Sequence, residues 1–232
     1  MVKPRGQRVA GKSTKARVRR AAPAADDRGT ETRILDAAHA VFLRRGTAGA
    51  RMQEIAQEAG VNPALLHYYF RSKERLSAAV FQRAAAELMP EVVHALASNV
   101  PLERKIRAVI DVELTRLLAT PYLPGYIISE LAHRPERVRE LLSTLVGRLP
   151  EEIGRDVLGT LRHQINAAVR AGEVRPMAPE EFVVNLLSLC IFPFAARPLW
   201  SVMLGWDDEG FQRFMARRRR DLPVFFLKAI RP

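Results

Sequence analysis

Cysteine and the short motifs of enzyme chemistry are scarce in this chain of 232 residues. Its single cysteine, Cys190, excludes a disulfide framework within the chain. The five histidines never show the H-x-x-x-H spacing and no second cysteine is present, so no metal site is expected. The chain also lacks G-x-S-x-G and G-x-G-x-x-G motifs, and we predict no P-loop. We therefore expect a protein that is not an enzyme and has no metal or other cofactor.

Alternating strand patterns and long uninterrupted apolar runs are missing as well. From residue 101 onward the apolar spacing is helical throughout, which predicts an all-α body. The most apolar stretch, residues 182–204, contains one charged residue, Arg197, but Pro193 and Pro198 interrupt it. Because a membrane-spanning helix needs about 20 apolar residues, we expect no membrane span. No N-terminal segment has the basic-then-apolar layout of a signal peptide, so we expect a cytoplasmic protein.

Residues 50–76 predict two short helices joined by a tight turn. Gly60 stands where a helix C-terminus favours positive φ. Asn62 then provides an N-cap, and Pro63 occupies the first position of the second helix. This helix-turn-helix arrangement, over about 51–70, places its second helix in the DNA major groove. Before the turn, four apolar residues lie at i, i+3, i+4 and i+7 of the first helix: Met52, Ile55, Ala56 and Ala59.

The second helix of this pair has an apolar side and an outward side. Leu66, Tyr69 and Phe70 share the inward stripe, and Phe70 is expected to pack in the core. The residues left on the outward side, able to face DNA, are Pro63, Ala64, Leu65, His67 and Tyr68.

This stretch resembles the DNA-binding domain of the TetR family of bacterial transcriptional regulators. The resemblance covers roughly residues 28–76. It rests on Phe42 and Gly46 near the end of a first helix, I-A-x-x-A-G-V at residues 55–61, L-x-x-Y-F at residues 66–70 and S-K-E-x-L at residues 72–76. The chain differs from the usual family residues at Ala50, Ala64, Leu65 and His67. The resemblance implies a three-helix DNA-binding head followed by a helical body.

Several residues are expected to contact DNA. Helix starts favour phosphates because their backbone N–H groups and dipoles point outward there. Arg51 and Lys73 lie at such starts, and the resemblance implies a phosphate contact for Tyr69. Gln53 can pair with adenine, and Tyr68 is expected on a phosphate. The predicted DNA-binding residues are Arg51, Gln53, Asn62, Pro63, Ala64, Leu65, His67, Tyr68, Tyr69 and Lys73.

The chain divides into three predicted regions. Residues 1–28 hold nine Lys or Arg against two Asp, a net charge of +7 of the total +12, and form a disordered basic tail. This tail either contacts DNA or only keeps the protein soluble. Residues 29–76 form the head, whose first helix covers roughly 31–45 with Thr30 as its cap. Residues 77–232 form the body, reached through a helix that Ser72 caps and that Pro90 should kink or end.

The last two predicted helices, about 180–195 and 211–230, are apolar on more sides than one packed face requires. One side would face the bundle, and the other would face a second subunit. Two such helices from each subunit could form a four-helix homodimer interface, which is how the family is known to pair. The basic run at residues 217–220 is expected to be a solvated face or to pair with acids across the dimer.

Bulky and polar residues of the body are either plain core or the lining of a ligand pocket. The resemblance implies a small apolar or amphipathic effector held inside this body. The candidate pocket residues are Tyr122, Tyr126, His133, Phe182, Cys190, Phe192, Phe194, Trp200 and Trp206.

These patterns favour a homodimeric transcriptional repressor that binds a roughly palindromic double-stranded operator and is released by an effector. Repression rather than activation follows the family's usual mode. Three alternatives stay open: a non-specific architectural DNA binder, a constitutive regulator without a ligand and, with least support, an enzyme.

Overall fold

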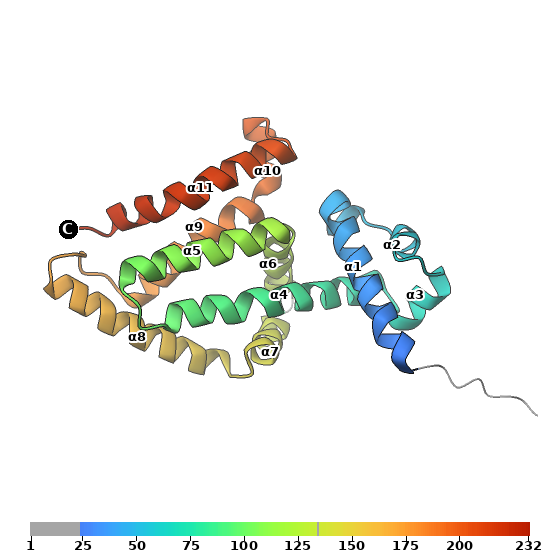
Figure 1. Cartoon of the computed structure of the whole chain (residues 1–232), viewed down its shortest axis with the longest axis horizontal. Helices are drawn as coiled ribbons and strands as arrows, with labels where there is room; N and C mark the ends of the chain where they lie inside the picture. The colour runs from blue at the N-terminus through green and yellow to red at the C-terminus, as the bar shows by residue number, and fades with distance from the viewer. Residues whose placement is uncertain (1–23, 134) are drawn as a thin grey trace, which may run out of the picture.

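The computed structural model describes residues 24–133 and 135–232, and for residues 24–27, 130–133, 135–138 and 141 it describes the backbone alone. These residues form eleven helices and no strand, which confirms the predicted all-α fold. Figure 1 shows a small head of three helices joined to a larger helical body by one long helix, α4. Most of the predicted basic tail lies outside the described residues, and residues 24–28 are the first residues of α1.

The head consists of α1 (Ala24–Gly49), α2 (Met52–Glu58) and α3 (Pro63–Tyr69). Gly46 interrupts α1 with φ 66° and ψ 168°, a combination that essentially only glycine adopts. The prediction that Thr30 caps the first helix is wrong, because α1 begins six residues earlier. Thr30 is buried within α1, and its Oγ1 accepts a hydrogen bond from Arg33 Nη2 at 3.0 Å. The head core is formed by apolar side chains that include Ile34, Ala38, Val41, Phe42, Ile55 and Leu66.

Helix α4 (Lys73–Ala97) passes from the head into the body. The Ser72 side chain caps it by accepting a hydrogen bond from Arg75 N at 3.3 Å, as predicted. Of the two outcomes predicted at Pro90, a kink or an end, the end is wrong, because the helix continues to Ala97. Pro90 is exposed, so the carbonyl that loses its helical partner there can be hydrated.

The body contains α5 (Leu102–Ala119), α6 (Leu123–His133), α7 (Pro135–Val146), α8 (Pro150–Arg170), α9 (Pro179–Ala195), α10 (Arg197–Leu204) and α11 (Asp208–Ala229). Helix α5 packs against α4, α9 and α11. Helices α9 and α11 run antiparallel, since Phe182 contacts Phe226 at one end and Phe194 contacts Phe211 at the other, each with 5.4 Å between ring centroids. Helix α10 was not predicted.

Helix α10 places an apolar surface outside the packed core. None of its residues is buried, and Leu199, Val202, Met203 and Leu204 are exposed. An ion pair of 2.5 Å between Arg197 and Asp208 holds its first residue to the start of α11. Among the described residues no single helix is long and apolar enough to cross a membrane, and α9 with α10 meets that measure only as a pair bent by 65°.

Two charged residues are buried in the body core. Lys105 on α5 donates to the carbonyl of Leu96, and burial lowers its pKa to about 8. Glu113, further along α5, has one side-chain oxygen without a hydrogen-bond partner, and burial raises its pKa to about 7. Glu113 also raises the pKa of the Cys190 thiol on α9, although burial is the larger cause. Because an acid with a raised pKa binds its proton more tightly in the folded state, Glu113 makes stability fall with rising pH.

Replacing Glu113 with Gln should remove this pH dependence. The free energy of unfolding of the wild type should fall relative to E113Q as the pH rises from about 4.5 to about 7, by on the order of 3 kcal/mol. Urea unfolding at pH 5 and pH 8 measures the difference, from which the shared contribution of Lys105 cancels. The exposed Glu140 supplies the control, E140Q, which should follow the wild type. An offset between wild type and E113Q that is equal at both pH values would contradict this account.

Candidate nucleic-acid interface and body groove

The turn between α2 and α3 has the backbone geometry that its sequence predicts. Gly60 adopts φ 64° after the end of α2. Asn62 Oδ1 accepts a hydrogen bond of 2.8 Å from Leu65 N, which satisfies one of the free N–H groups at the start of α3. Pro63 occupies the first turn, where its missing N–H has no cost. The helix-turn-helix geometry is therefore set by short-range contacts.

One side of α3 is anchored in the head core and the other faces solvent. Leu66 and Phe70 are buried, with Phe70 just beyond the last helical residue. Tyr69 is half-buried, between the rings of Tyr68 and Phe70. The exposed residues are Pro63, Ala64, Leu65, His67 and Tyr68, as predicted, and Tyr68 is 74% exposed. This side of α3 thus offers hydrogen-bonding and apolar groups on a rigid support.

The two predicted phosphate contacts at helix starts have different surroundings. Arg51, at the N-cap position of α2, is exposed and makes no side-chain cap bond, and Gln53, two residues later, is also exposed. Lys73 is less free, because its Nζ donates a 2.8 Å hydrogen bond to the carbonyl of Ala48 at the end of α1. An ammonium group has three donors, so Lys73 can hold this contact and still reach a phosphate.

Tyr122 joins the head to the body. It lies in the turn between α5 and α6, and its hydroxyl shares a hydrogen bond with His39 Nδ1 on α1. Its ring meets those of Phe42 and Phe81 edge-on, with centroids 5.9 and 5.5 Å away. Burial, followed by the nearby Arg83, lowers the pKa of His39, which favours its neutral form. Tyr126 stacks on Phe81 in the same region.

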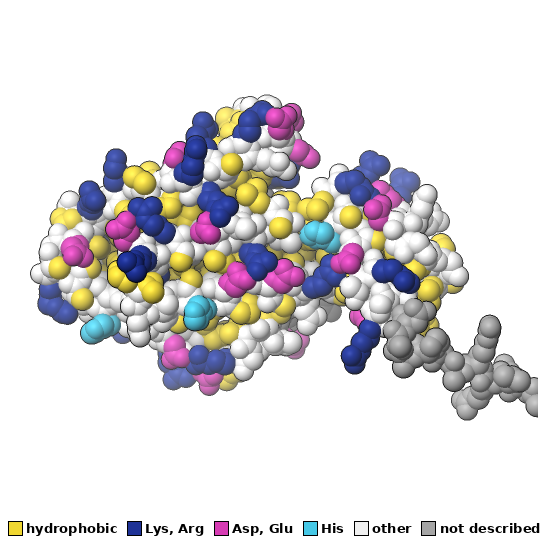
Figure 2. Space-filling view, in the orientation of Figure 1, with side chains coloured by type: hydrophobic (Ala, Val, Ile, Leu, Met, Phe, Trp, Pro, Cys, Tyr) yellow, Lys and Arg dark blue, Asp and Glu magenta, His cyan; other side chains and the backbone are white. Residues whose placement is uncertain are grey.

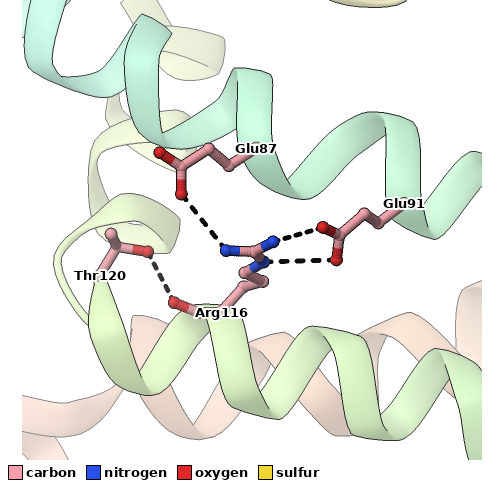
Figure 3. Close-up of polar contacts among 4 residues, drawn as sticks. All are labelled: Glu87, Glu91, Arg116 and Thr120. Carbon is pink, nitrogen blue, oxygen red and sulfur yellow. Dashed lines mark hydrogen bonds and ion pairs between the residues drawn. The ribbon is translucent and has the colours of Figure 1, made fainter.

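An exposed ion-pair group holds α5 to α4 just before this turn. Arg116 on α5 pairs with Glu87, at 3.3 Å, and with Glu91, both on α4 (Figure 3). The Arg116 carbonyl also accepts a 2.9 Å hydrogen bond from Thr120 Oγ1 at the end of α5. Exposed ion pairs add little stability by themselves. This group links α5 to α4 close to the turn that contains Tyr122.

A groove of about 540 Å³ opens between α9, α10 and α11. Of the predicted pocket residues, Phe192, Trp200 and Trp206 line it. Sequence reasoning missed the rest of the lining, which consists of Asn185, Ser188, Leu189, Pro193, Leu204, Phe214, Arg217 and Arg218. The spacing of apolar residues in α9 does not distinguish the residues that line the groove from those in the core, because apolar residues occupy every side of the helix.

The other predicted pocket residues lie elsewhere. Phe182, Cys190 and Phe194 are fully packed in the body core, and burial raises the pKa of the Cys190 thiol, as expected of an inert buried cysteine. Tyr122 and Tyr126 lie at the contact between head and body. His133 is among the residues for which the structure describes the backbone alone.

No group of three or more His, Cys, Asp or Glu in the described residues could hold a metal ion. The prediction of no P-loop needs one correction: residues 6–13, GQRVAGKS, do have the spacing G-x-x-x-x-G-K-S. A P-loop joins a strand to a helix. These eight residues lie outside the described part of the chain, and the described part contains no strand. The spacing alone therefore gives no argument for nucleotide binding.

Head and turn geometry define a helix-turn-helix DNA-binding protein. Residues 34–80, which cover the head from the middle of α1 into α4, match the model of the tetR family of bacterial regulatory proteins. This match confirms the predicted resemblance to the TetR family of transcriptional regulators over these residues.

Two curated relatives resemble about half of this chain. The chain is 35% identical to the transcriptional regulator BetI of Rhizobium meliloti over 121 residues, 50% of this chain and 58% of BetI. It is 36% identical to a transcriptional repressor of Streptomyces coelicolor over 124 residues, 49% of this chain and 60% of the repressor. The chain thus spans less than two thirds of these relatives' length. They are transcriptional regulators rather than enzymes, in agreement with the prediction.

Two solved structures share the fold across most of the chain. A TetR/AcrR-family regulator from Thermobifida fusca has a TM-score of 0.54 and 21% identity, covering 85% of this chain and 97% of its own. The ketosteroid transcriptional regulator KstR2 of Mycobacterium tuberculosis has a TM-score of 0.57 and 16% identity, covering 87% of this chain and 95% of its own. At these identities the likeness concerns the fold alone.

Proposed function

We propose that this chain is a homodimeric, ligand-responsive repressor that acts in the cytoplasm on a roughly palindromic operator. The observation that carries the proposal is the solvent-facing side of α3, held in place by Asn62 and by the buried Leu66 and Phe70. A short helix with a fixed axis and an exposed polar and aromatic side is suited to the major groove.

Within this proposal, contacts divide into positioning and reading. Arg51, Lys73, Tyr68 and Tyr69 contact phosphates, which fixes the register of the head but carries no sequence information. Gln53 and the outward residues of α3 face base edges, where Gln pairs with adenine and Ala or Leu packs on a thymine methyl group. These roles are supported by the exposure of Arg51, Gln53 and the outward residues of α3, whereas Tyr69 and Lys73 are partly exposed.

Pairing through α9 and α11 is supported by apolar side chains left in solvent. Val184 on α9 is 61% exposed, and Val224 and Phe225 on α11 are 44% and 60% exposed. The antiparallel packing of α9 and α11 brings these positions to the same end of the helix pair. A second copy that covers them would place two heads on one operator, with recognition helices roughly 34 Å apart.

Replacing Gln53 with Ala should relax the sequence preference. On an operator selected from random duplexes, wild-type protein should prefer its site over bulk DNA by about a thousandfold or more. Q53A should lose on the order of 1–3 kcal/mol of binding free energy, confined to one base position in each half-site. Competition gel-shift assays at fixed salt measure both quantities. Q82A, at an exposed α4 position, is the control. Wild-type preference at every position in Q53A would refute the base contact, and no preference in the wild type would favour the non-specific binder.

Replacing Phe225 with Glu should produce monomers, because the change puts a charge into the proposed apolar interface. Sedimentation velocity should show twice 26.1 kDa for the wild type and 26.1 kDa for F225E. Q212E adds the same charge at an exposed α11 position on a different side of the helix and should stay dimeric. If F225E keeps the mass of a dimer, subunits do not pair through this part of α11.

A further inference from the structure

The groove between α9, α10 and α11 has apolar aromatic walls. Phe192 meets Trp200 edge-on at 6.0 Å between centroids, and Trp206 lies against Phe214 at 4.6 Å. A smaller hollow of about 290 Å³ adjoins it, sharing Trp206, Phe214 and Arg217. A volume of about 540 Å³ lies within the range of small-molecule sites, roughly 300–1,000 Å³. Apolar walls of this size fit one elongated apolar molecule.

Positive charge is concentrated at one wall of the groove. No acid is among its lining residues, whereas Arg217 and Arg218 are. Arg218 is held in place, since its Nε and Nη2 both donate to the carbonyl of Leu189, at 3.2 and 2.9 Å. Two other α11 arginines are paired, Arg213 with Glu209 and Arg219 with Asp111, and Arg220 lies outside the groove. Arg217 has no ion pair among the described residues and keeps its charge for a ligand.

The groove begins on α9 at Asn185, next to Val184 of the proposed pairing surface, and extends from there toward the other end of the helix pair. Val184, Val224 and Phe225 are near the Phe182–Phe226 contact, whereas Phe192 and Phe214 are near the Phe194–Phe211 contact. In Figure 1, α10 and the start of α11 lie at the end of the body nearer to the head. Lys and Arg side chains also line α11 on the face shown in Figure 2. A second copy with the same charges is therefore a poor occupant for the groove.

We propose that this groove binds an amphipathic carboxylate. Its apolar chain or ring system lies between Phe192, Trp200 and Phe214, and its carboxylate pairs with Arg217, in the positive field of Arg218. Guanidinium–carboxylate pairs are short, charge-assisted and stronger where water is partly excluded. Asn185 and Ser188 supply further hydrogen-bonding groups along the groove.

A ligand in this groove has a short structural route to the DNA-binding head. The groove wall α9 packs against α6, and Tyr122 directly before α6 contacts His39 and Phe42 on α1. A ligand that favours another position of α9 would shift the population of head orientations. This consequence rests on the proposed function, whereas binding in the groove does not.

The two tryptophans of the chain, Trp200 and Trp206, both line the groove, so tryptophan emission reports its occupancy. The probes are dodecanoate, dodecanol and dodecyltrimethylammonium, each below its micelle concentration, titrated into the full chain. Wild-type emission should change saturably with dodecanoate, and affinity should be about tenfold weaker for dodecanol and weakest for the cation. R217Q should lose about tenfold in dodecanoate affinity and keep its dodecanol affinity. R220Q, at an exposed position of α11 outside the groove, should match the wild type.

Three results would overturn the assignment: no saturable change with dodecanoate, equal affinity for all three probes, or unchanged dodecanoate affinity in R217Q. An emission change that depends only on protein concentration would show that a second copy of the chain occupies the groove. This result would also overturn the assignment to a carboxylate ligand. Release of operator DNA is measured separately with the same probes. If dodecanoate binds through Arg217 and DNA stays bound, the groove assignment stands and release by this ligand class is refuted.

Discussion

Helix α4 is buried at both of its ends in different hydrophobic cores, and the arrangement of the molecule depends on this. Leu76 and Val80 belong to the head core, whereas Phe81, Leu88 and Val92 belong to the body core. Since one rigid helix serves both cores, the head cannot turn without disturbing packing in the body. Tyr122 reinforces the junction from the body side, because it packs against both cores. Head orientation is thereby tied to the state of α5, α6 and α9.

This constraint relates the two surfaces on which the proposed function depends. The orientation of the head decides where the outward side of α3 can meet DNA. Helix α4 and Tyr122 fix that orientation relative to the body. Exposed apolar residues on α9 and α11 provide the means to fix two heads at one separation. The groove beside α10 lies on the same α9 that packs against α6. In the proposed function, pairing, ligand binding and DNA binding thus share one structural connection through α9, α6 and α4.

Local signals in the sequence were enough for the head but not for the groove. The Gly60 turn, the Asn62 and Ser72 caps and the buried side of α3 each depend on residues within four positions of one another, so the sequence predicts them. Helix α10 had usable signals, namely Pro198 near its start and Gly205 at φ 64° after its end. The side of α9 that faces the groove and the contact of Tyr122 with His39, 83 residues apart, depend on tertiary packing, which periodicity does not report. Pro90 does not end α4, because an exposed proline can be accommodated in a helix whose other side is buried.

In the proposed dimer, one rigid body holds two α3 helices at the spacing of successive major grooves. Hydroxyl-radical footprinting of the full chain on its selected operator tests this most directly. We expect two protected regions, related by a two-fold axis and centred about 10 base pairs or a whole multiple of the helical turn apart. A single protected half-site, or uniform protection without a two-fold axis, would contradict the account.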